Sequence, residues 1–179
     1  GCVRLVRFRR NFGKTAAGKR WANPHETDTQ ARFALEAFGG TQAEGRRVTV
    51  RLWADQVHEL KAFGVALNYD PTQVAFEGSR PGPGALLESQ GGTAPLFQVL
   101  YQRPGQLVLG NGLTRGEPVS GRGLLAEMDF RLLGTSTEAV FDLAEGYIAS
   151  SGEAVRAVAQ LGSARLVPRQ YALFANFPN

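Results

Sequence analysis

Short runs in which hydrophobic and polar residues alternate cover most of the chain from residue 32 onward. The clearest run is 124–133, where one side of the alternation holds Leu124, Ala126, Met128, Phe130 and Leu132. Successive side chains of a strand point to opposite faces, so this period of two predicts strands with one buried face. The same pattern predicts strands over residues 32–38, 46–55, 60–69, 74–76, 95–101, 106–109, 139–143, 147–149, 154–159 and 164–167.

Turn residues separate these runs at regular intervals. The chain holds 22 glycines and 9 prolines, and Arg103-Pro104-Gly105 is a hairpin signal between two runs. Residues 110–123 are expected to form a long loop, and residues 85–89 a short helical turn. About nine or ten short strands with marked turns predict an all-β fold of two antiparallel sheets packed face to face. We expect the core to contain Phe63, Val65, Leu67, Met128, Phe130 and Leu132.

Composition divides the chain into a basic N-terminal extension (1–30), a body (31–168) and a tail (169–179). Residues 1–20 hold seven bases and no acid, so the remaining 13 bases face all 16 acids and leave the rest of the chain net negative. A basic extension of this kind can bind nucleic acid or an acidic membrane surface, or it can be a flexible lead-in or a docking segment. We favour the last two interpretations. No run reaches the roughly 18 apolar residues that cross a bilayer.

The start of the extension is short and β-prone. An extended conformation places Cys2, Val6 and Phe8 on one face and Val3 and Leu5 on the other. We expect residues 1–12 to become ordered only on contact with another subunit, as a strand added to the edge of that subunit's sheet. This interpretation predicts self-assembly into a filament.

Groups for catalysis are few, and their spacing fits no known site. The only histidines are His25 and His58, and Cys2 lies in the extension. Glu127 and Asp129 share one strand face, which favours a solvated surface over a hydrolytic pair. No spacing fits a phosphate loop, a zinc site or a calcium loop. We therefore expect no enzyme activity, no cofactor and no metal.

Three segments of the body resemble the cohesin family. They are Val-Thr-Val-Arg-Leu at 48–52, the strand, Tyr-Asp-Pro turn and following strand at 60–76, and the glycine-led strand at 121–133. The resemblance implies a jelly-roll β-sandwich of about nine strands that binds a dockerin-like module on a bacterial cell surface. Cohesins usually carry polar side chains on the outer face of the strand before Tyr-Asp-Pro. Here that face carries Ala62, Gly64, Ala66 and Asn68, which suits either close approach of another backbone or a cover from the chain's own loop.

The tail at 171–179, Tyr-Ala-Leu-Phe-Ala-Asn-Phe-Pro-Asn, resembles the start of a type IX secretion C-terminal sorting domain. This resemblance implies secretion to the cell surface, and an ordinary linker is the alternative.

These observations predict an extracellular, non-catalytic module for protein–protein interaction or assembly. The alternatives are a cohesin-type scaffold module with a separate dockerin-like partner and a carbohydrate-binding sandwich; nucleic acid is not an expected partner. The expected partner-binding residues are Cys2, Val3, Leu5, Val6, Phe8, Ala62, Gly64, Ala66 and Asn68.

Overall fold

Long β-strands dominate residues 26–167, the part of the chain that the computed structural model describes. The nine strands of this part are β1 (Thr27–Gly39), β2 (Arg47–Tyr69), β3 (Val74–Arg80), β4 (Gln98–Arg103), β5 (Gln106–Gly112), β6 (Val119–Leu132), β7 (Ala139–Ser150), β8 (Arg156–Leu161) and β9 (Ser163–Leu166). Two 3-10 turns, η1 (Gln42–Glu44) and η2 (Leu86–Glu88), lie between strands. The second turn confirms the short helical turn expected at 85–89.

Strand β2 runs through both layers of the fold. Its first half pairs with β1 and β6, and its second half pairs with β5 and β7. The pairing with β6 shifts register on both sides of Val57, and Gln56 and Glu59 adopt positive φ angles of 53° and 46°. Bulges of this kind bend a strand and increase its twist. Residues 46–55 and 60–69 are therefore one bent strand, where the sequence pattern predicted two.

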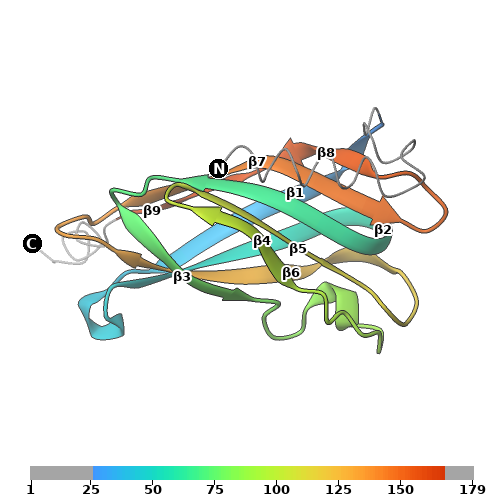
Figure 1. Ribbon diagram of the computed structural model, residues 1–179, viewed down its shortest axis with the longest axis horizontal. Helices are drawn as coiled ribbons and strands as arrows, with labels where there is room; N and C mark the ends of the chain where they lie inside the picture. The colour runs from blue at the N-terminus through green and yellow to red at the C-terminus, as the bar shows by residue number, and fades with distance from the viewer. Residues whose placement is uncertain (1–25, 168–179) are drawn as a thin grey trace, which may run out of the picture.

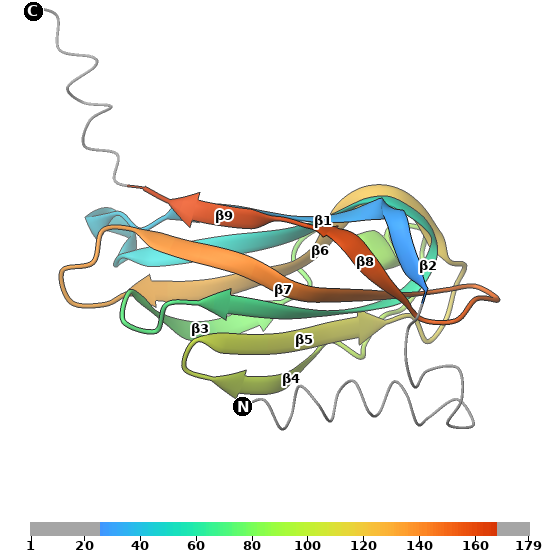
Figure 2. The same cartoon turned by 90° about the horizontal axis from the view of Figure 1, so that it is seen from above.

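The strands form two packed layers (Figure 1, and from above in Figure 2). Sheet one contains β3, β6, the first half of β2 and β1, while sheet two contains β4, β5, the second half of β2, β7 and β9. Strand β8 pairs with β7 in an antiparallel and with β1 in a parallel arrangement, so it joins the sheets along one side. The predicted all-β sandwich is confirmed, with β1–β8 as a parallel pair among antiparallel ones.

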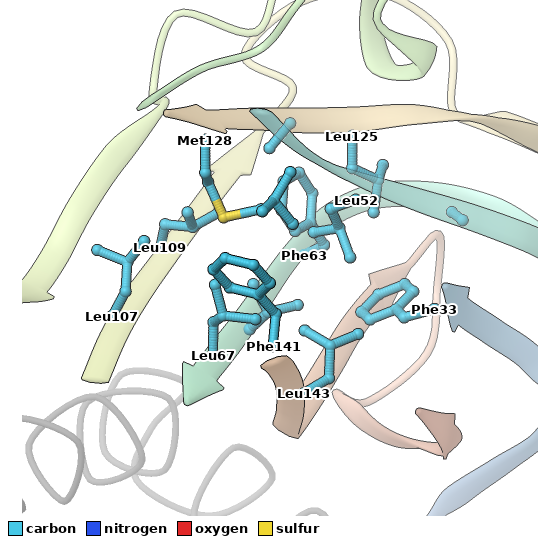
Figure 3. Close-up of a cluster of buried hydrophobic side chains, with 14 of the residues drawn as sticks. Phe33, Leu52, Phe63, Leu67, Leu107, Leu109, Leu125, Met128, Phe141 and Leu143 are labelled. Atoms are coloured by element: carbon cyan, nitrogen blue, oxygen red, sulfur yellow. The ribbon is translucent and has the colours of Figure 1, made fainter. Parts of the chain in front are cut away.

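Apolar side chains from both sheets fill the space between the layers (Figure 3). All six residues predicted for the core are buried: Phe63, Val65, Leu67, Met128, Phe130 and Leu132. The ring of Phe130 lies 5.0 Å from that of Tyr69, 5.5 Å from that of Phe76 and 4.9 Å from that of Phe141, measured between centroids. These neighbours come from β2, β3 and β7, so the Phe130 ring contacts both sheets.

Two segments predicted to interrupt the strands belong to strands in part or in whole, and both contain glycine. Residues 110–123 were expected to be a loop, but β5 extends to Gly112 and β6 begins at Val119. A Cβ on Gly110 would lie 2.7 Å from the Phe63 carbonyl oxygen, and one on Gly146 in β7 would lie 2.7 Å from the Phe33 ring. These glycines permit close approach within a strand, whereas the sequence pattern takes glycine as a sign of a turn.

The Tyr-Asp-Pro turn connects β2 to β3. The Asp70 carboxylate accepts hydrogen bonds from the Thr72 hydroxyl at 2.6 Å and from the Thr72 backbone N–H at 2.8 Å. These bonds, led by the one from the hydroxyl, lower the pKa of Asp70 below its ordinary value. The Tyr69 ring is buried, and its hydroxyl donates a hydrogen bond to the Arg103 carbonyl oxygen at 3.3 Å.

Candidate functional site

The outer face of sheet one carries a ladder of alternating charges. The Glu127 carboxylate on β6 accepts hydrogen bonds from Arg51 Nε on β2 at 2.7 Å and from Arg80 Nε on β3 at 3.1 Å. The Arg51 Nη1 atom also lies 3.8 Å from the Glu36 Oε1 atom on β1. Arg80 pairs with Asp129, and the hydrogen bond to this carboxylate raises the pKa of Arg80. The Glu127 side chain is only 5% exposed, so the expectation of a solvated strand face is wrong for this residue.

The ladder satisfies its own charges. Both carboxylates that a hydrolytic pair would need, Glu127 and Asp129, are held by guanidinium groups on the same face. A catalytic carboxylate must be accessible to its substrate, and the Glu127 carboxylate is buried between two arginines. This face therefore has a structural role within the sheet.

The outer face of sheet two is composed differently. Strand register places its outward residues in four rows, of which the first crosses β7, β2 and β5 and the other three also cross β4. The rows are Ala149–Ala62–Gly112, Tyr147–Gly64–Gly110–Gln98, Glu145–Ala66–Val108–Tyr101 and Asp142–Asn68–Gln106–Arg103. The first three rows are mostly small or apolar, and the fourth is polar.

The four predicted binding residues of β2 lie together in the middle of this face, one in each row. Ala62 is half-buried, Gly64 and Ala66 are buried, and Asn68 is exposed. Ala66 belongs to a second apolar cluster, separate from the core between the sheets. The members of this outer cluster are Ala66, Tyr101, Val108, Tyr147 and Val155.

Sequence reasoning missed the contribution of β5 to the face. Val108, Gly110 and Gly112 point outward beside the β2 residues, while Leu107 and Leu109 point into the core. The alternation of leucine with valine and glycine over 106–112 is the signal that could have shown this. It was overlooked because Gly110 and Gly112 were assigned to a loop.

Several predicted residues lie outside the described part of the chain. They are Cys2, Val3, Leu5, Val6, Phe8 and His25, together with the tail that resembles a sorting domain. Binding by the extension, filament assembly and the sorting role of the tail therefore stay predictions.

A histidine, the acidic residues and a pocket are the features of residues 26–167 that bear on catalysis and metal binding. His58 lies at the bend of β2, 77% exposed, with its Nε2 atom 3.6 Å from the Glu59 carboxylate. In this part of the chain, no cluster of three or more His, Cys, Asp or Glu residues is placed to hold a metal ion. A pocket of about 340 Å³ lies between the start of β3 and the β4–β5 turn. Its lining is Tyr69, Pro71, Val74, Ala75, Phe76, Gln102, Arg103 and Pro104, which includes no carboxylate and no histidine.

The same described range bears on two other ligand classes. It contains no helix with the length and apolarity that a membrane crossing requires. A glycan platform needs aromatic rings exposed in a row, but Tyr101 and Tyr147 on the outer face of sheet two are 6% and 8% exposed. This exposure does not favour the carbohydrate-binding alternative at this face.

Solved structures provide the comparison with known proteins, since no protein-family model and no curated protein matches the sequence. The cohesin module of a family 33 glycoside hydrolase from Clostridium perfringens superposes with a TM-score of 0.61 at 10% identity, over 79% of this chain and 98% of that module. The chain has a cohesin fold. The sixth cohesin of scaffoldin B from Acetivibrio cellulolyticus was solved in complex with a Cel5 dockerin. It superposes with a TM-score of 0.55 at 15% identity, over 74% of this chain and 97% of that one.

A non-cellulosomal cohesin from the archaeon Archaeoglobus fulgidus superposes with a TM-score of 0.53 at 19% identity, over 82% of this chain and 99% of that one. The cohesin-like chain thus contains the whole sandwich of these modules. Identities of this size establish the fold alone, and they confirm the jelly-roll sandwich that the three sequence segments implied.

Proposed function

We propose that this cohesin-like chain is a non-catalytic protein-binding module and that it binds its partner through the outer face of sheet two. The observation that carries the proposal is the difference between the two outer faces. Charges on sheet one are paired with each other, whereas the middle of sheet two presents small and apolar residues. Apolar residues gathered on the outside of a sandwich mark an interaction surface.

The composition of the face indicates how a partner binds. Gly64 and Gly110 are paired across β2 and β5, and the absence of side chains there allows a partner's backbone to approach closely. Asn68 and Gln106 in the polar row provide hydrogen-bonding groups at one end, which would fix the partner's direction. A dockerin-like module that presents a helix or strand with small side chains fits this surface.

The size of the face sets a further requirement. Seven residues of β2 across four strands cover about 23 Å by about 14 Å, or about 320 Å². A stable interface buries about 800 Å² on each partner. The partner must therefore also contact the loops around the face.

The place of action is proposed from the two resemblances. Similarity to cohesin modules and a tail that resembles a type IX sorting domain both support a secreted protein at a bacterial cell surface. Recovery of the protein from the surface fraction of its own cells, with loss of that location on deletion of residues 169–179, tests this part.

The binding face is tested with charge substitutions on the two outer faces. Ala66→Arg and Asn68→Arg alter sheet two, and the second is the milder change because Asn68 is exposed. Ala34→Arg, at an exposed position of β1, is the matched control on sheet one. A partner captured from the native culture is purified, and its affinity for each variant is measured by isothermal titration. We expect a loss of at least about 100-fold for the sheet-two variants and less than about threefold for Ala34→Arg.

Circular dichroism and a thermal melt establish that each variant is folded. Equal affinity of folded Asn68→Arg and the unaltered protein for the purified partner would place the binding site elsewhere and refute the proposal.

A further inference from the structure

One side of the sandwich is open. The edge strands on this side are β3 of sheet one and β4 of sheet two, and they lie away from β1 and β9 (Figure 2). Strand β8 joins the two sheets on the other side, whereas no pairing among the described strands joins β3 to β4. The connection from β3 to β4 enters the core at one end of the open side, through Leu86 and Leu87 of η2. The pocket beside Pro71 and Pro104 lies at the other end.

The inner side of β4 is exposed along this opening. Val99 and Gln102 lie opposite Leu109 and Leu107 of β5, which both belong to the core cluster. Residues directly opposite each other in a sheet share a face, so Val99 and Gln102 also point inward. Val99 is nevertheless 39% exposed, and Gln102 is exposed as well. Inward positions that stay exposed indicate an opening between the two layers.

Aromatic rings of the core line the pocket in this opening. Tyr69 and Phe76 belong to the lining, and their ring centroids lie 5.0 Å and 5.5 Å from that of Phe130. Phe76 is only half-buried, and Pro71 and Pro104 add to the apolar lining. The volume of about 340 Å³ is near the lower end of the range of about 300–1,000 Å³ for ligand sites. The pocket therefore has room for one ring-sized apolar group.

The polar residues of the lining determine which apolar group fits. Gln102 provides an amide, and Arg103 provides the only charge among the residues that line the pocket. Asp70 is the neighbour of Pro71 in the chain, but its carboxylate accepts hydrogen bonds from Thr72. A guanidinium group binds a carboxylate through charge-assisted hydrogen bonds. The pocket therefore favours an apolar group next to a carboxylate over one next to an amine.

Arg103 also connects the pocket to the outer face of sheet two. It ends the polar row Asp142–Asn68–Gln106–Arg103, and it lines the pocket. The central part of that face covers about 320 Å², which is less than the area of about 800 Å² that a stable interface buries on each partner. A partner on sheet two that also fills the pocket gains contact area. Aromatic side chains buried in pockets are common anchors of such interfaces.

We propose that the pocket receives one aromatic side chain, next to a carboxylate, from the protein partner that binds sheet two. The ring packs against Tyr69 and Phe76, and the carboxylate binds Arg103. The origin of this ligand in the sheet-two partner rests on the proposed function, whereas the chemistry of the pocket does not. A free small molecule with the same groups fits the same pocket, so the experiment has to separate the two sources.

The chemistry of the pocket is tested without a partner. Phenylacetate is the probe, and phenethylamine is the control with the opposite charge; each is titrated into ¹⁵N-labelled protein and followed by NMR. We expect phenylacetate to shift the amide signals of Phe76 and Gln102 and to leave those of Gly64 and Arg51, in the middle of sheets two and one, unchanged. Phenethylamine should bind at least about tenfold more weakly, because repulsion replaces a charge-assisted hydrogen bond. Unshifted signals at Phe76 and Gln102, or equal binding of the two probes, would overturn the proposal.

The origin of the ligand is tested with the purified partner. Gln102→Trp introduces a ring at the pocket from an exposed position, and Ala34→Trp at an exposed position of β1 is the matched control. Arg103→Gln is a second, milder variant that removes the charge. We expect the affinity for the partner to fall at least about tenfold for Gln102→Trp and Arg103→Gln, as for an interface anchor, and less than about threefold for Ala34→Trp. Circular dichroism establishes that each variant is folded.

The same titration separates the pocket from the binding face. Unchanged affinity of folded Gln102→Trp and Arg103→Gln for the partner would assign the pocket to a small free ligand and overturn the proposal. If Asn68→Arg still weakens binding in that case, the proposed function stands and only the pocket is excluded. Weaker binding by Gln102→Trp together with unchanged binding by Asn68→Arg would instead refute the proposed face.

Discussion

Replacement of Phe130 by alanine should be among the most destabilising single changes in the sandwich. The side chain is 0% exposed, and its ring contacts those of Tyr69, Phe76 and Phe141 with centroids 4.9 to 5.5 Å apart. Truncation of a buried phenylalanine costs about 3–5 kcal/mol. Each aromatic pair adds about 0.5–1.5 kcal/mol beyond burial, and three pairs are lost. We therefore expect the free energy of unfolding to fall by about 5 kcal/mol, the upper end of the range for a buried phenylalanine.

Equilibrium unfolding in urea, followed by tryptophan fluorescence, measures this loss. The slope of the transition should stay constant, because a changed slope would indicate an altered unfolded or native state. Leu96→Ala is the control, since Leu96 is 50% exposed and its truncation should cost less than about 0.5 kcal/mol. A loss below about 1 kcal/mol for Phe130→Ala would mean that the ring does not fill the space between the sheets.

Two further predictions concern polar groups. Glu127→Gln should lower the free energy of unfolding in urea by about 1–3 kcal/mol, because the charge-assisted hydrogen bonds from Arg51 and Arg80 are weakened. The control is Glu36→Gln, which should cost less than about 1 kcal/mol, because the Glu36 side chain is 53% exposed. Equal losses for the two variants would contradict a special role for the buried carboxylate. Asp70 should titrate by NMR below the ordinary aspartate pKa of about 3.9, and Thr72→Val should raise that pKa. Because the folded-state pKa is lowered, the stabilisation by Asp70 is present above pH 3.9 and is lost as the pH falls through the folded-state pKa. An Asp70 pKa unchanged by Thr72→Val would show that the hydroxyl is not its main partner.

The sequence pattern was sufficient for strands whose faces differ in polarity. Ala126, Met128, Phe130 and Leu132 of β6 alternate into the core as predicted. The prediction was wrong for Leu124, because a register shift between β2 and β6 puts Leu125 into the core cluster in its place. The pattern could not show that β2 is continuous, because the bend uses positive φ at Gln56 and Glu59, and neither residue type signals that conformation. The strand ends at Gly112 and Val119 were also missed, because the sequence alone does not distinguish a glycine at a close backbone contact from a glycine in a turn.

The candidate site was only partly accessible from sequence, because it depends on pairing between distant segments. The outward residues of β2 follow from alternation within one strand. Their neighbours on β5 and β7 do not, since register between strands is a property of the fold. The burial of Glu127 was hidden for the same reason. Its partners Arg80 and Arg51 lie 47 and 76 residues away in the chain.

The small residues of sheet two are poorly explained by stability alone. Cross-strand pairs stabilise a sheet through contacts between large side chains, and sheet one uses this device with its paired charges. The pair Gly64–Gly110 at the centre of sheet two provides no such contact. Glycine inside a strand also costs about 0.5–1 kcal/mol relative to alanine. Gly110 is required by the nearby Phe63 carbonyl, but half-buried Ala62 on β2 could be a larger β-former in a purely structural sheet. A face that forgoes stabilising contacts in this way gains only when another backbone packs against it, and this supports the assignment of sheet two to binding.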